Sequence, residues 1–150
     1  MLWKKILLDS IKAGTVAALA MIPFGLAFRL AGLRVGHYGP KFAHLFVSDP
    51  GIPFRFAQHI VIGWVSAVPL VAWLYLRPRG GLSPVAVGAL YGAGYYVVVN
   101  SLLLPISFED PLPWTLGFQT IVPSLVIHLV FGAAIGYVCQ RVGSTARSDA

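Results

Sequence analysis

Ionisable side chains inside long apolar stretches are the first candidates for chemistry in this sequence. His59 and His128 each stand in such a stretch, where an ionisable group is costly and by default indicates a function. Two facing histidines can hold a haem inside a helical bundle. If Arg77 and Arg141 mark one membrane surface, His59 lies 18 residues and His128 lies 13 residues from it, so the rings differ in height by about 7.5 Å. We therefore expect no haem and no other cofactor.

Metal binding and nucleophilic catalysis have little support. Zinc ligands recur at characteristic spacings, and no such spacing relates the remaining candidates, which are His37, His44, Asp49 and Glu109. Ser124 and His128 stand four residues apart, as a nucleophile and its base would. However, a serine in a membrane helix more often bonds its own backbone, and no carboxylate is near in sequence to orient the histidine. The single cysteine, Cys139, forms no intrachain disulfide and is expected to fill apolar space. The sequence predicts no enzyme.

The composition indicates the elements that carry these residues. The chain has 150 residues, of which 57% are hydrophobic and 11% charged, with a mean hydropathy of +0.78. Soluble domains contain about 45–50% apolar and about 25% charged residues, so a soluble globule, a disordered chain and a disulfide-stapled module are all excluded. We expect one integral membrane domain over residues 1–150.

The length of the apolar stretches predicts four membrane-spanning helices. A span needs about 20 apolar residues, and four stretches qualify, at residues 11–33, 56–76, 82–104 and 118–139. Polar residues at positions 9, 10 and 12 interrupt the apolar run that a signal peptide requires, so the first helix is expected to be retained. Residues 2–10 are expected to form an amphipathic extension at the interface. The predicted fold is all-α, a four-helix bundle.

Basic residues predict the orientation, because cytoplasmic loops carry an excess of Lys and Arg. With both termini inside, seven basic residues lie in the cytoplasm: Lys4, Lys5, Lys12, Arg77, Arg79, Arg141 and Arg147. Four then lie at the outer side: Arg29, Arg34, Lys41 and Arg55. The net charge of +6 is interpreted as topology and contact with anionic lipid rather than nucleic-acid binding.

The two halves of the chain resemble one another. His59 and His128, 69 residues apart, are each followed by Val two positions on and by small residues four and eight positions on. The first and third spans both open with small residues, around Gly14 and Gly88. This pattern predicts two tandem helical hairpins related by an axis along the membrane normal. The alternative is chance, since Gly, Ala and Val are common in membrane helices.

Residues four apart share one helix face, and each span has one such face that is small at its inner end and polar at its outer end. Small residues allow the close helix packing that membranes favour, so we expect packing at Gly63, Gly88, Gly92, Gly132 and Gly136. We expect an outer polar cluster of Arg29, His59, Asn100 and His128, closed by Glu109 or Asp110. These groups either bond one another and fix helix register, or line a small hydrated cavity open to the outer face.

A family resemblance covers residues 55–140. A histidine opens the second span, Leu112-Pro113-Trp114 follows a third span that ends at a proline, and the fourth span carries His128-Leu129-Val130. This order and spacing resembles the YagU family of small bacterial inner-membrane proteins, whose activity is not established. The resemblance implies an inner-membrane location and oligomerisation, and it implies no catalytic residue.

Two functions follow as expectations. The first is a non-enzymatic structural or accessory protein that contacts membrane lipid and associates with itself or joins a larger membrane complex. The second is a small transporter or pH-responsive permeability element that uses His59 and His128.

Overall fold

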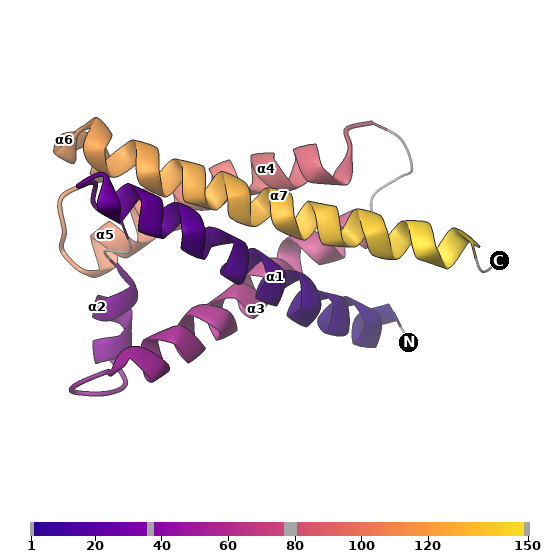
Figure 1. Ribbon diagram of the computed structural model, residues 1–150, viewed down its shortest axis with the longest axis horizontal. Helices are drawn as coiled ribbons and strands as arrows, with labels where there is room; N and C mark the ends of the chain where they lie inside the picture. Colours follow the sequence, from indigo (N-terminus) through magenta and orange to yellow (C-terminus); the bar gives the residue numbers. More distant parts are fainter. Residues whose placement is uncertain (1, 36–37, 77–80, 149–150) are drawn as a thin grey trace.

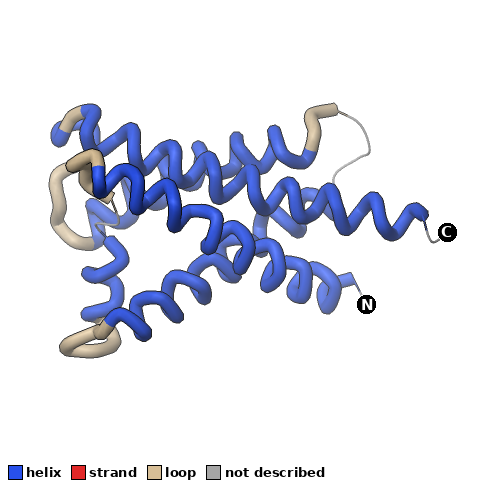
Figure 2. Tube along the Cα trace, viewed as in Figure 1, coloured by secondary structure: helices blue, strands red, loops and turns tan. Residues whose placement is uncertain are grey.

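The computed structural model describes residues 2–35, 38–76 and 81–148, and no strand occurs in these ranges (Figure 2). Eight helical segments follow one another along the chain. They are α1 (Leu2–Leu30), α2 (Tyr38–His44), α3 (Ile52–Leu76), α4 (Pro84–Tyr95), the π-helical segment η1 (Tyr96–Leu103), α5 (Leu104–Ser107), α6 (Pro113–Leu116) and α7 (Phe118–Ser148).

Four stretches are long and apolar enough to cross a membrane, which confirms the predicted all-α fold with four spans. Their bounds are Leu2–Leu30, Ile52–Leu76, Pro84–Ser107 and Phe118–Val142. The third of these runs without a break through α4, η1 and α5. The even number of spans agrees with the two chain ends, which lie at the same end of the molecule (Figure 1).

The first span begins earlier than expected, because residues 2–10 form the first turns of α1 and continue into it without a break. Ile6, Asp9 and Ser10 are buried, so this part of α1 packs against other helices. The Ser10 hydroxyl donates to the carbonyl of Ile6 at 2.7 Å, and it is thereby satisfied within its own helix. The sequence predicts that the span begins after these polar residues, whereas burial and hydrogen bonds within the bundle allow the helix to continue through them.

The four spans form two tight pairs, α1 with α3 and α4 with α7, and the pairs are joined chiefly by α1 against α7. Each tight pair consists of spans that are consecutive in the sequence, as the two-hairpin pattern predicts. The beginning of α3 diverges from α1, and α2 lies between them (Figure 1). By contrast, α3 and α4 make few contacts with each other.

Glycines set the closest approach within each pair. A Cβ on Gly14 of α1 would lie 2.6 Å from the carbonyl oxygen of Gly63 in α3, and a Cβ on Gly88 of α4 would overlap the carbonyl oxygen of Gly132 in α7. Gly92 faces the backbone at His128 in the same way. The sequence aligns Gly63 with Gly132 and relates the first and third spans only through small residues around Gly14 and Gly88. In the structure both hairpins close on a glycine-to-glycine backbone contact, which makes Gly14 and Gly88 equivalent.

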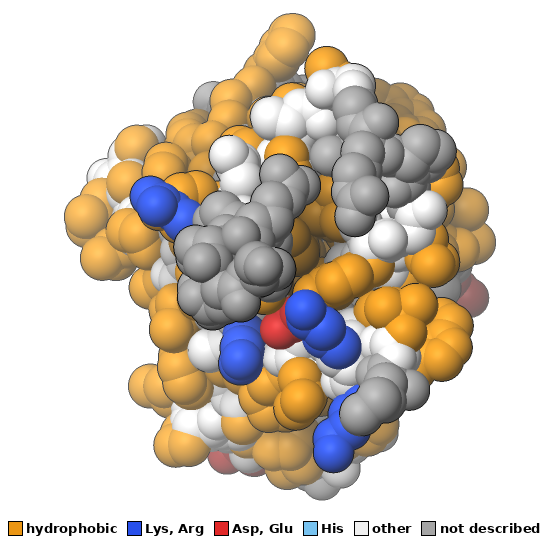
Figure 3. All heavy atoms as spheres, turned by 90° about the vertical axis from the view of Figure 1, so that its right-hand side faces the viewer, with side chains coloured by type: hydrophobic (Ala, Val, Ile, Leu, Met, Phe, Trp, Pro, Cys, Tyr) orange, Lys and Arg blue, Asp and Glu red, His pale blue; other side chains and the backbone are white. Residues whose placement is uncertain are grey.

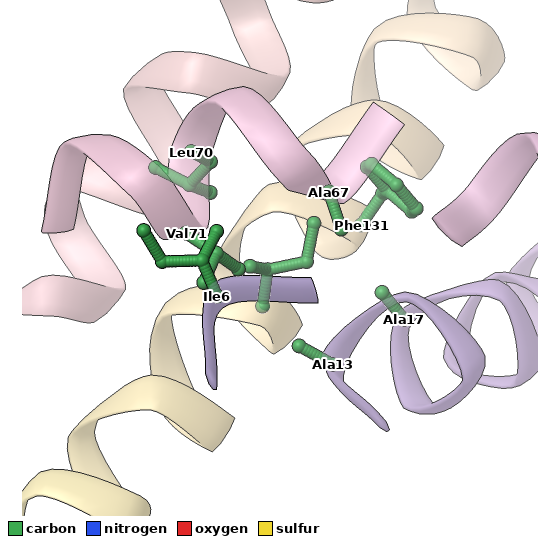
Figure 4. Packing of buried hydrophobic residues seen from close by; sticks show 8 residues of the cluster. Ile6, Ala13, Ala17, Ala67, Leu70, Val71 and Phe131 are labelled. Carbon is green, nitrogen blue, oxygen red and sulfur yellow. The ribbon is translucent and has the colours of Figure 1, made fainter. Parts of the chain in front are cut away.

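The buried core is small and lies where α1, α3 and α7 meet (Figure 4). It consists of Ile6, Ala13, Ala17, Ala67, Leu70, Val71, Phe131 and Ile135. Only 22–33% of each span is buried, and most large apolar side chains lie on the outside. Such a surface is matched to lipid, because lipid tails are as apolar as leucine and close packing rather than water exclusion holds the helices together.

Candidate functional site

His128 and Asn100 form a hydrogen-bonded pair between α7 and η1. The Asn100 Nδ2 lies 2.8 Å from the His128 Nε2, and the His128 Nδ1 lies 2.6 Å from the carbonyl oxygen of Ser124. A carbonyl only accepts, so Nδ1 carries the proton and donates it to Ser124, while Nε2 accepts from the Asn100 amide. The two partners therefore select one tautomer of a neutral ring.

Aromatic rings surround this histidine and extend the network to α3. The Tyr95 ring stacks on the His128 ring with centroids 5.8 Å apart and planes 19° apart, and Tyr96 lies at the same centroid distance, tilted by 46°. The Tyr95 and Ser66 hydroxyls are 2.8 Å apart, and the Tyr91 hydroxyl donates to the Ser66 carbonyl at 2.6 Å. Three spans are thus tied together around His128.

The π-helical segment η1 holds two of these groups. Tyr96 and Asn100 lie within it, and the Leu104 N–H donates to the carbonyl of Val99, five residues earlier. Tyr96 is 5% exposed, and its hydroxyl is buried with no partner among the described residues. Short π segments are rare and recur at functional sites, and a buried hydroxyl without a partner is unusual.

His59 does not share this site. Its Nε2 lies 3.1 Å from the carbonyl oxygen of Ala18, so it links α3 to α1 in the first hairpin. His128 bonds within the second hairpin. The two histidines therefore have separate partners, which supports neither their bonding to each other nor the alternative in which both line one outer cavity. Sequence position placed His59 near the outer end of its span and His128 near or above the midplane, but each bonds the neighbouring helix of its own pair.

The charged members of the expected cluster also lie elsewhere. Arg29 and Glu109 are both exposed, and an exposed charge is satisfied by water or lipid head groups rather than by a buried partner. Asp110 pairs instead with Lys41 of α2, whose Nζ lies 2.5 and 2.6 Å from the two carboxylate oxygens. Of the five predicted cluster residues, the structure brings together only Asn100 and His128.

The Asp110–Lys41 pair ties together the loops at this end of the bundle. Tyr38 of α2 stacks on Phe108 with ring centroids 6.0 Å apart. Burial, followed by the negative charge of Asp110, raises the pKa of the Tyr38 hydroxyl above its usual value. The two loops that follow the first and third spans are therefore held by one ion pair and one aromatic stack.

A second polar site lies at the opposite end of the bundle, and sequence reasoning missed it. Asp9 is 6% exposed and accepts a short hydrogen bond from the Tyr75 hydroxyl of α3, while the Lys5 Nζ lies 5.5 Å from the centre of the Tyr75 ring. Asp9 stands four residues before Ala13, which opened the small-residue face assigned to the first span. Extending that face by one turn would have found the carboxylate.

A hollow of about 400 Å³ surrounds this carboxylate. Figure 3 views the end that carries both chain termini and shows Lys and Arg side chains around an acidic group. The lining residues come from the first turns of α1 and the last part of α7: Lys4, Lys5, Leu8, Asp9, Lys12 and Val142.

No group of three or more metal-ligating side chains occurs among the described residues. His37, Arg77, Arg79 and Arg147, which entered the zinc and orientation hypotheses, lie outside the residues whose side chains are described. Cys139 is partly buried in α7. No family model, curated protein or solved structure matches the chain.

Proposed function

We propose that the protein is a non-enzymatic component of the bacterial inner membrane, with both termini in the cytoplasm, that associates with a second copy of itself or with a larger membrane complex. One observation supports this proposal most directly, an apolar groove on the lateral face between α3 and α4. The resemblance to the YagU family, which implies oligomerisation, agrees with it.

The groove lies between α3 and α4, which make few contacts with each other. Ser66 bonds Tyr91 and Tyr95 across this boundary, and the groove itself is an apolar hollow of about 360 Å³. Trp73 and Leu90 on its rim are each 61% exposed. The complete lining is Pro69, Leu70, Trp73, Val87, Leu90 and Tyr91.

A groove of this kind suits a helix of a neighbouring chain. Helices in lipid associate through van der Waals packing and shape, because lipid already satisfies apolar side chains. A concave apolar surface with a protruding ring such as Trp73 offers more packing area to a helix than a smooth helix face does. Such a contact would let the bundle gain packing that its own four helices do not supply.

Cysteine cross-linking in the native membrane tests the proposal. In a Cys139→Ser background, Leu90→Cys should form disulfide-linked dimers, whereas Val16→Cys should not. Val16 is the equivalent position in the first hairpin, because Gly14 corresponds to Gly88, and its side chain is 45% exposed. Adding Trp73→Ala should reduce cross-linking at position 90. Equal cross-linking at positions 16 and 90, or none at position 90, would refute self-association through this groove.

A second candidate function is a pH-responsive permeability element centred on His128 alone. The unpartnered hydroxyl of Tyr96 favours it, because the Tyr96 ring lies against the His128 ring and a buried hydroxyl without a protein partner can bind a water molecule. Proton flux into liposomes should then rise as the pH is lowered, because protonation of the ring is the switch. His128→Gln should abolish that rise, and His59→Gln, which alters the other hairpin, should preserve it. Identical flux from protein-free liposomes excludes this function.

A further inference from the structure

The hollow around Asp9 has the positive charge of a site for an anionic group. Lys4, Lys5 and Lys12 contribute three positive charges to its lining, and Asp9 is the one carboxylate there. The Asp9 side chain is buried and engaged by the Tyr75 hydroxyl, whereas all three lysines are exposed. No ion pair joins any of these lysines to a carboxylate in the part of the chain that the structure describes. The mouth of the hollow is therefore positive.

The spacing of the lysines places charge and apolar surface side by side. Lys4, Leu8 and Lys12 succeed one another at intervals of four residues, so they share one face of α1. The same stretch exposes further large apolar side chains to the membrane, namely Trp3, Leu7 and Ile11. A soluble anion would use only the lysines, whereas an amphiphile would use both parts of this surface.

The hollow also lies at the level of the membrane surface. It is formed by the first turns of one span and the end of another, Val142, where the apolar part of α7 ends. Exposed Trp3 stands at the same end, and tryptophan is enriched at the level of lipid head groups. Basic pockets between helices at a membrane surface bind phosphate-bearing head groups.

We propose that this hollow binds the phosphate head group of an anionic phospholipid in the leaflet next to the two chain termini. The ammonium groups of Lys4, Lys5 and Lys12 contact the phosphate oxygens, and the acyl chains run along Leu8 and Ile11. Asp9 also lines the hollow, but its carboxylate accepts the hydrogen bond from Tyr75 that holds α1 against α3, so it anchors the wall of the site.

Retention of lipid by the purified protein tests this proposal. The protein is reconstituted in nanodiscs of phosphatidylcholine with or without phosphatidylglycerol, extracted into mild detergent and analysed by native mass spectrometry. Phosphatidylglycerol should remain bound in preference to phosphatidylcholine. A variant with Lys4→Gln, Lys5→Gln and Lys12→Gln should lose affinity on the order of 100-fold, since each lysine near a membrane surface contributes about fivefold.

A matched variant removes the same charge from the other end of the molecule. Arg29→Gln, Arg34→Gln and Arg55→Gln, all at exposed positions, should leave retention of phosphatidylglycerol intact. Equal losses in the two triple variants would mean that net charge alone attracts the lipid and would overturn the proposal. Circular dichroism of both variants checks that their helices are retained.

Competition with a soluble head group distinguishes a lipid from a free anion. Glycerol phosphate added to the detergent extract should fail to displace phosphatidylglycerol, because it has no acyl chains to lie along α1. Leu8→Ser should weaken retention of the lipid. Displacement by glycerol phosphate, together with unchanged retention in Leu8→Ser, would refute a lipid site.

Discussion

The side-chain amide of Asn100 donates to Nε2 of His128 across 2.8 Å, and this bond joins the π-helical part of the third span to α7. It lies beyond the glycine contact between the same helices, where Gly92 meets the backbone at His128. The second hairpin is therefore held twice at His128: the backbone of this residue packs against Gly92, and its ring accepts the hydrogen bond from Asn100.

Asn100→Leu should destabilise the protein by about 0.6 kcal/mol and by no more than about 1.7 kcal/mol, the mean and the maximum found for hydrogen bonds between membrane helices. The substitution removes the donor to Nε2 while the bond from Nδ1 to Ser124 remains. Unfolding in mixed detergent measures the loss, and ¹⁵N NMR of the His128 ring should still report a proton on Nδ1. An unchanged stability would show that the bond contributes nothing net.

Gly88→Ala should separate α4 from α7, because the new Cβ would overlap the carbonyl of Gly132. Overpacking of this kind typically costs about 1–3 kcal/mol, and Gly132→Leu should cost at least as much. Gly94→Ala is the matched control in the same helix, since a Cβ there meets nothing within 4 Å. Thermal unfolding in detergent compares the three variants, and equal melting temperatures for positions 88 and 94 would contradict the assignment.

How much was visible in the sequence differs from residue to residue. The spacing predicted packing at Gly63 and at the glycines of α4 and α7, because residues four apart share a helix face. It predicted neither Gly14 as a packing residue nor which glycines meet. The partnership of Asn100 with His128 was foreseen only as part of a larger cluster. The π-helical segment could not be predicted, because its residues are of types that an ordinary α-helix also contains. Its wider turns change which side chains face the neighbouring helix.

The predictions for Asp9 and Arg29 were wrong for opposite reasons. Asp9 was treated as the end of a span, but the Tyr75 hydroxyl satisfies it and allows the helix to continue. Arg29 was expected to require a carboxylate, but it is exposed and requires none. In both cases the burial of the side chain decides the outcome. Burial depends on how neighbouring helices pack, so the sequence around the residue does not reveal it.

Tyr75→Phe should destabilise the end of the bundle that carries the termini. The change removes the hydroxyl that donates to Asp9 and leaves a buried carboxylate without this partner, which typically costs about 1–3 kcal/mol or more. Tyr137→Phe provides the control, because Tyr137 is half exposed. Hydrogen exchange of the first turns of α1 should accelerate in Tyr75→Phe only.

Alkaline pH should weaken the loops at the opposite end. The pKa of Tyr38 is raised above 10.0 in the folded protein by burial and by Asp110, so the folded state retains this proton longer than the unfolded chain does. The stabilisation is complete below pH 10.0 and is lost as pH rises through the raised pKa. Tyr38→Phe should remove this decline, measured as the difference between the stability–pH curves of the two proteins. Parallel curves above pH 10.0 would refute it.

Labelling with a membrane-impermeant maleimide tests the proposed orientation. In a Cys139→Ser background, Glu109→Cys should react from outside intact cells, because Glu109 is exposed at the end away from the termini. Lys4→Cys should react only after the cells are opened. The reverse labelling pattern would show that the termini lie outside the cell and would contradict the proposed orientation.

The equivalent glycine contacts have a consequence for biogenesis. Gly14 meets Gly63, and Gly88 meets Gly132, so each close contact joins spans that leave the ribosome one after the other. The first hairpin has all the residues of its tight contact once α3 has been synthesised, before any part of the second exists. Insertion into the membrane can then proceed in two steps of two helices each, and the contacts of α7 with α1 and α3 must wait until α7 has been synthesised.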